Sequence, residues 1–164
     1  MNEPAWLTEA RRHIGKREVP GTKSNPWIVG LWRAEAWLGE DDGKVPWCGL
    51  FMRECMRVAG IKSPAFAYRA KSWLSWGEPT ITPCIGCIVV FERDGGGHVG
   101  LVVGVDGRGS LMVLGGNQGD SVKISPFAIS RVAGYRVPKG YKIPPLEMKL
   151  PVLASSGGLS TNEV

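Results

Sequence analysis

The stretch Val45-Pro46-Trp47-Cys48-Gly49-Leu50-Phe51 places a cysteine at the expected start of a helix. Pro46 suits the entry of a helix better than its interior, so the helix should begin close to Cys48. Backbone N–H groups at a helix start have no partner within the helix, and they can stabilise a thiolate or an oxyanion. Cys48 is therefore a candidate nucleophile, and the alternative is a small buried residue. The apolar residues at helical spacing are Phe51, Cys55 and Val58, with Gly60 as a plausible stop.

A second candidate is His98, which follows the turn-like run Asp94-Gly95-Gly96-Gly97 and opens an expected strand, 98–105. Alternation along the strand puts His98 on a glycine-lined face and four apolar residues on the other face. We expect the Cys48 helix to cross the glycine-lined face, which would bring thiol and imidazole within reach. The alternative is a surface histidine at a strand end. One face carries His98, Gly100, Val102 and Gly104, and the other face carries Val99, Leu101, Val103 and Val105.

A third candidate, Asn117, lies in Gly115-Gly116-Asn117-Gln118, directly after the expected strand 110–114. An imidazole that acts as a base needs a group that holds its second nitrogen, and an amide can do this. Asn117 could therefore orient His98. The alternative is an ordinary turn residue, because Gly-Asn pairs are common in turns.

Seven segments in order resemble the small CHAP-like and NlpC/P60-like cysteine peptidases, which are peptidoglycan amidases or endopeptidases and are often phage-borne. The resemblance covers roughly residues 6 to 138. It implies a papain-like α+β fold, with Cys48 as nucleophile, His98 as base and Asn117 as the orienting residue. The segments are Ile14-Gly15-Lys16-Arg17-Glu18-Val19-Pro20-Gly21, Asn25-Pro26, Trp47-Cys48, Gly86 with Val89-Val90-Phe91, Gly97-His98-Val99-Gly100, Leu114-Gly115-Gly116-Asn117-Gln118 and Gly134-Tyr135-Arg136-Val137-Pro138.

The sequence departs from this family at two places. Cys87 stands where relatives usually have an acidic residue, and Gly49 stands where small relatives often have alanine. The glycine is expected to loosen the first helical turn. Cys84-x-x-Cys87 also has the spacing of half a zinc site, with His98 as a third ligand and Cys55 or His13 as a fourth. We expect instead that Cys84 and Cys87 are inert thiols, and we expect no metal or cofactor.

The organisation predicted from the pattern is an α+β fold in which N-terminal helices pack on an antiparallel sheet. One catalytic domain should span residues 1–140, and a Pro-, Ser- and Gly-rich tail, 141–164, should be draped on the surface or disordered. The expected helices carry Trp6, Leu7, Ala10 and Ile14, then Trp27, Ile28, Leu31 and Leu38 after the cap Asn25, then the Cys48 helix, then 67–74; the expected strands are 88–91, 99–105, 110–114, 121–124 and 131–137.

Seven tryptophans are many for 164 residues, and most should lie in the core. Trp47, beside the nucleophile, and Trp73 or Trp76 could line a groove, because flat aromatic faces suit sugar rings. The acidic run Glu40-Asp41-Asp42 lacks the alternating ligand spacing of a calcium loop and is expected to be a solvated turn.

The composition, with 43% hydrophobic residues, is typical of a single soluble domain with a hydrophobic core. A net charge of +5 and a pI near 9.2 favour anionic partners, including cell walls. No basic run or nucleic-acid motif is present, so no nucleic-acid partner is expected. No stretch is long enough to span a bilayer, and no export signal is recognised at the N-terminus. The protein should be made in the cytoplasm, act as a monomer, and reach the wall by release or delivery.

The predicted function is that of an endolysin-like peptidoglycan hydrolase. The Cys48 thiolate would attack an amide carbonyl in the peptide stem or at its N-acetylmuramoyl-L-alanine junction, and a thioester would form and be hydrolysed. The sequence does not distinguish an amidase from an endopeptidase. The alternative is a zinc-stabilised or catalytically silent module that binds the wall or another partner.

Overall fold

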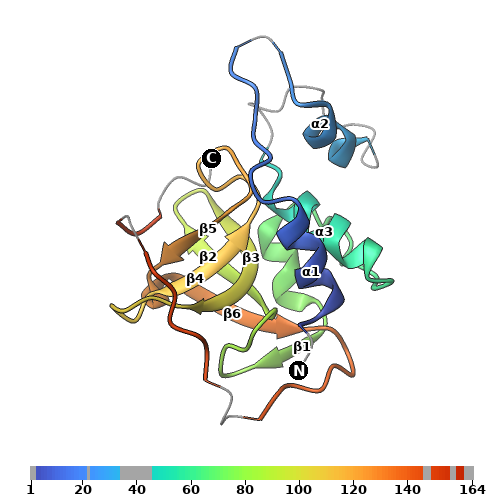
Figure 1. The fold of residues 1–164 in the computed structure, drawn as a ribbon. Coiled ribbons are helices and arrows are strands. Elements are labelled where there is room, and N and C mark those ends of the chain that lie inside the picture. Colours follow the sequence, from blue (N-terminus) through green and yellow to red (C-terminus); the bar gives the residue numbers. More distant parts are fainter. Residues whose placement is uncertain (1–2, 22, 34–45, 146–148, 156–157, 161–164) are drawn as a thin grey trace.

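A computed structural model describes residues 3–21, 23–33, 46–145, 149–155 and 158–160. It confirms the expected α+β class, with helices packed on an antiparallel sheet (Figure 1). The expected positions Leu38 and Glu40-Asp41-Asp42 lie outside the described residues. No helix among the residues described is both long and apolar enough to cross a bilayer.

Within the described residues, three α-helices and two 3₁₀ helices accompany the sheet. The Asn25 side chain accepts the Trp27 N–H at 2.9 Å, so the expected cap of the second helix is confirmed. The Cys48 helix starts at Cys48 itself, and Gly60 (φ 74°) follows its end, as expected. The elements are α1 (Ala5–Arg12), α2 (Pro26–Trp32), α3 (Cys48–Val58), η1 (Ala70–Ser75) and η2 (Ile129–Arg131).

Two helix expectations were wrong. Ile14 lies beyond the end of α1 and is 46% exposed, because the chain leaves the helix at His13. Val58, in the last turn of α3, is 47% exposed, because it faces a pocket beside α1 and not the core. The expected helix 67–74 is confirmed only in part, as the 3₁₀ segment η1.

In the part of the chain that the structure describes, six antiparallel strands form one sheet in the order β1-β6-β2-β3-β4-β5. Glycine-rich turns separate most neighbours, which allows the hairpin pairings β2–β3 and β3–β4. The expected strands are confirmed in place except that 121–124 is shifted to β5, and β1 was not anticipated. The strands are β1 (Glu78–Thr80), β2 (Ile88–Arg93), β3 (Gly96–Val105), β4 (Leu111–Gly115), β5 (Lys123–Phe127) and β6 (Val132–Val137).

The helices cover the apolar face of β3, not the glycine-lined face. Val99, Leu101 and Val103 belong to the same core cluster as Cys48 and the other buried apolar side chains of α3. The glycine-lined face packs instead on other strands and loops: a Cβ at Gly100 would lie 3.6 Å from the Gln118 amide oxygen, and Gly104 lies against the Pro151 carbonyl. The expected crossing of α3 over the glycines was therefore wrong, because the larger apolar area lay on the opposite face. Cys48, the first residue of α3, instead approaches the His98 end of β3 through the contact of its sulfur with the Val99 backbone.

Described parts of the C-terminal segment are held on the sheet by backbone hydrogen bonds. Val105 donates its N–H to the Pro151 carbonyl (2.9 Å) and accepts the Leu153 N–H (2.7 Å), and Ser160 donates to the Pro126 carbonyl (2.7 Å). Tyr141 packs edge-on against Trp6 in α1, with ring centroids 5.1 Å apart. In Figure 1 this red segment follows the outside of the sheet.

Candidate functional site

Cys48 lies at the first residue of α3 and is 3% exposed, with its thiol against the backbone of β3. The backbone N–H groups of Val99 and Gly49 hydrogen-bond to the sulfur and lower its pKa, and the charge of Arg93 acts in the same direction. Burial is the larger effect, and the pKa of the Cys48 thiol is raised above its ordinary value of 9.0. The helix start therefore does not by itself produce a thiolate in this structure.

The contact with Val99 brings Cys48 to the end of β3 that carries His98. His98 is fully buried, and its imidazole stacks on Phe127 with centroids 5.3 Å apart and planes 5° apart. Phe127 stacks in turn on Phe91 at 4.5 Å. These two rings come from β5 and β2, so the sheet itself determines the orientation of the imidazole plane.

Gln118 holds His98, with the amide oxygen Oε1 2.9 Å from the ring nitrogen Nε2. The amide nitrogen of Gln118 donates to the carbonyls of Val113 (3.0 Å) and Lys123 (2.8 Å), in the paired strands β4 and β5. Both amide hydrogens are thus used, and the oxygen must face the histidine. His98 therefore carries its proton on Nε2 when neutral, and Nδ1 carries the lone pair that can accept a proton.

The orienting amide that the structure shows on Nε2 is that of Gln118, one residue after the expected Asn117. Asn117 is buried and left-handed, with φ 57°, in the same loop. No side chain fits at Gly115, where a Cβ would collide with the Gln118 amide oxygen and lie 3.3 Å from His98 Nε2. The sequence could have pointed to Gln118, because the run Gly115-Gly116-Asn117-Gln118 contains two amide side chains and Gln118 is the second.

Trp47 precedes Cys48 and is held by two other segments. Its indole N–H donates to the Glu18 carboxylate at 2.8 Å. A Cβ at Gly116 would lie 2.6 Å from the indole, so the ring packs directly on the loop that carries Gln118. Glu18 also donates its backbone N–H to the Asp120 carbonyl (2.8 Å) in that loop. The start of α3 and the Gln118 loop are thereby tied together.

Trp47 and Trp73, the two rings expected to line a groove, are both buried in this structure. Both side chains are 0% exposed in the core, and Trp76 is 7% exposed. Trp73 donates its indole N–H to the Ala67 carbonyl at 2.9 Å, and Trp76 donates to the Lys62 carbonyl at 2.8 Å. Trp73 and Trp76 therefore hold the loops that contain Ala67 and Lys62.

The described residues contain no group of three or more histidine, cysteine or carboxylate side chains that could hold a metal ion. His98 bonds to Gln118, and His13 bonds to Glu9 at 2.8 Å. Cys84 and Cys87 are buried free thiols that contact each other, and the Cys87 thiol lowers the pKa of Cys84 by hydrogen bonding. The four proposed zinc ligands are therefore not gathered in one place.

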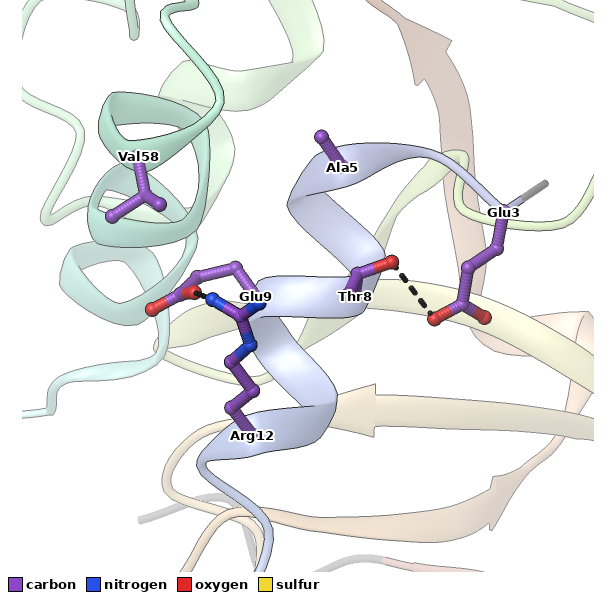
Figure 2. A pocket seen from close by; sticks show the side chains of 6 residues that line it. All are labelled: Glu3, Ala5, Thr8, Glu9, Arg12 and Val58. Carbon is purple, nitrogen blue, oxygen red and sulfur yellow. Dashed lines mark hydrogen bonds and ion pairs between the residues drawn. The ribbon is translucent and has the colours of Figure 1, made fainter.

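A pocket of about 490 Å³ lies between α1 and the end of α3 that carries Val58 (Figure 2). Figure 2 shows Glu9 and Arg12 directed toward each other there, and the two form an ion pair at 3.1 Å. An eleven-residue helix is about 16 Å long, so this pocket is at the opposite end of α3 from Cys48. It contains none of the candidate site residues.

Comparison with known proteins gives one family. Residues 40–117 match the CHAP domain, a family of peptidoglycan hydrolases and amidases. Neither the search of curated proteins nor the search of solved structures found a match. The matched stretch contains Cys48, His98 and Asn117, and it ends one residue before Gln118. The resemblance of this chain to the CHAP family is therefore confirmed over residues 40–117.

Proposed function

We propose that the chain is a cysteine-dependent peptidoglycan hydrolase, endolysin-like in its action, that cleaves an amide bond in the wall peptide or at its junction with muramic acid. The observation that carries this is the hydrogen bond of Gln118 to His98 Nε2 at 2.9 Å. It leaves Nδ1 as the basic nitrogen at the end of β3 where the Cys48 thiol contacts the backbone of Val99.

In the proposed reaction, His98 Nδ1 takes the thiol proton as the sulfur of Cys48 attacks the amide carbonyl and forms a C–S bond. The backbone N–H groups at the start of α3 stabilise the oxyanion. The imidazolium then gives its proton to the leaving amine as the C–N bond breaks. Water attacks the thioester, His98 takes a proton from it, and the C–S bond breaks to release the acid and restore the thiol.

The raised pKa of Cys48, caused by its burial, supports a protonated thiol in the resting site. A buried thiol loses its proton most easily to a base that is already in place, because the proton does not have to pass through water. In this proposal the protein acts on bacterial peptidoglycan as a monomer, and it reaches the wall after release or delivery.

The test is hydrolysis of purified sacculi by the wild type, Cys48→Ala and His98→Ala. We expect Cys48→Ala to abolish the release of fragments and His98→Ala to lower it by about 10²-fold or more, with both variants folded by circular dichroism. Mass spectrometry of the fragments assigns the broken bond and separates amidase from endopeptidase. Full hydrolysis by Cys48→Ala would overturn the proposal.

A further inference from the structure

The loop 66–69 packs on the residue that follows the proposed nucleophile. A Cβ at Gly49 would collide with the Ala67 carbonyl oxygen and lie 3.0 Å from the Tyr68 carbonyl group. Gly49 is thus required by close packing. The loop is fixed from inside, because Trp73 donates to the Ala67 carbonyl and Arg69 donates its N–H to the Phe66 carbonyl, both at 2.9 Å.

Phe66 has a backbone conformation that a bulky side chain rarely adopts. Its φ is 56°, and the other described non-glycine residues with positive φ, Asn117 and Asp120, flank Gln118. Asparagine and aspartate tolerate this conformation, whereas phenylalanine is strained in it. The Phe66 side chain gains little from burial, since the residue is 61% exposed. The ring contacts described for Phe66 are with the neighbouring side chains of Tyr68 and Arg69, in the same loop.

Arg69 joins the exposed Phe66 and the half-buried Tyr68 in one patch. Its guanidinium lies 5.4 Å from the centroid of each ring, and the two rings meet edge-on at 6.2 Å. Contact with two aromatic rings restrains the guanidinium, and its N–H groups can still bind a carboxylate in the fork geometry that arginine favours. The patch therefore offers a cation and an apolar surface together.

We propose that Phe66, Tyr68 and Arg69 form a substrate subsite beside Cys48 for the carboxylate-bearing part of the wall peptide. Arg69 binds the carboxylate, and the Phe66 ring covers the aliphatic carbons next to it. This inference rests on the proposed function, because an anionic wall peptide is expected beside Cys48 only if Cys48 is the nucleophile of a peptidoglycan hydrolase. The cationic patch and the net charge of +5 both suit such a ligand.

The test uses a soluble fragment of wall peptide as substrate, with KM and kcat measured for Phe66→Asn and Arg69→Gln. Asparagine keeps the positive φ and removes the ring. We expect KM to rise about tenfold in Arg69→Gln, with kcat within about twofold of the wild type, because binding is lost and the chemistry is not. Phe66→Asn should also raise KM, and its melting temperature should be equal to or above that of the wild type.

The matched control is Ile81→Asn, which replaces an apolar side chain that is 98% exposed outside this patch. It should leave KM and the melting temperature unchanged. Added salt should raise the KM of the wild type more than that of Arg69→Gln, since screening weakens only the ion pair. An unchanged KM in Arg69→Gln would overturn the subsite, whereas absence of hydrolysis by the wild type would overturn the proposed function instead.

Discussion

At the scale of single residues, the amide that holds His98 depends on contacts between strands. Asn117 and Gln118 are adjacent and both buried, and either has the chemistry to hold an imidazole. The choice is made by the carbonyls of Val113 and Lys123, which bind the Gln118 nitrogen and direct its oxygen to His98. The sequence predicts the loop and an amide as the group that holds His98. It does not predict which amide, because these two carbonyls come together only when β4 pairs with β5.

We expect Gln118→Leu to lower kcat on sacculi by about 10²-fold, because the leucine leaves the imidazole without the acceptor that fixes its tautomer. Asn117→Gly keeps the positive φ of its position and serves as the matched variant. It should retain most of the activity. The assignment to Gln118 fails if Asn117→Gly is the more damaged of the two while both melt near the wild-type temperature.

The raised pKa of Cys48 gives a second expectation at this scale. Only the thiolate reacts with iodoacetamide, so the rate of Cys48 labelling should rise with pH between 6 and 9, by up to about tenfold per unit. Cys55, on the same helix, is fully buried and should stay unlabelled in the folded protein. Peptide mapping after timed labelling measures each thiol separately. Fast, pH-independent labelling of Cys48 near pH 6 would show a preformed thiolate and contradict this expectation.

At the scale of elements, the start of α3 is positioned by a segment that lies thirty residues earlier in the chain. Backbone hydrogen bonds join Gly15 and Lys16 to Val122, and Glu18 to Asp120. The Glu18 carboxylate then binds the Trp47 indole. Glu18 lies in a motif that supports the family resemblance, but no local pattern shows that a carboxylate there contacts Trp47. Helix positions follow from periodicity, whereas this contact follows from the complete fold.

Glu18→Ala should lower kcat on sacculi by about tenfold while the fold is kept, because the indole loses a charge-assisted hydrogen bond worth about 1.5–3 kcal/mol. Glu18→Gln retains an oxygen acceptor and should recover part of the loss. Glu54→Ala is the matched control: Glu54 lies on α3 and binds Arg57 at 2.7 and 2.8 Å, near the other end of the helix from Cys48. Equal losses in Glu18→Ala and Glu54→Ala would exclude a specific role for Glu18.

At the scale of the whole molecule, the sequence predicts the elements better than the faces they bury. The period of two in β3 correctly divides Val99, Leu101 and Val103 from His98 and Gly100. The error was to place α3 over the glycines, because a bare face looks ready to receive a helix. Apolar area decides instead: the helices cover the valine and leucine face, and the glycines leave room for Gln118 and for Pro151.

Burial of α3 against this sheet also determines how stability responds to alkali. The pKa values of Cys48 and Cys55 are raised above 9.0, chiefly by burial. Above about pH 9 the unfolded chain releases these protons while the folded protein still holds them, so stability falls as pH rises toward the folded-state pKa values. Each thiol contributes up to about 1.4 kcal/mol per pH unit in that window.

We therefore expect the free energy of unfolding, measured with urea under reducing conditions, to fall between pH 8 and pH 10. Cys55→Ala should start lower, because it leaves a cavity in the core, but its stability should fall less steeply over the same interval since one of the buried thiols is gone. The prediction compares the slopes of the unfolding free energy against pH. The cavity lowers the free energy itself and does not change its slope. Parallel slopes for the wild type and Cys55→Ala would mean that the Cys55 thiol loses its proton as easily in the folded protein as in the unfolded chain.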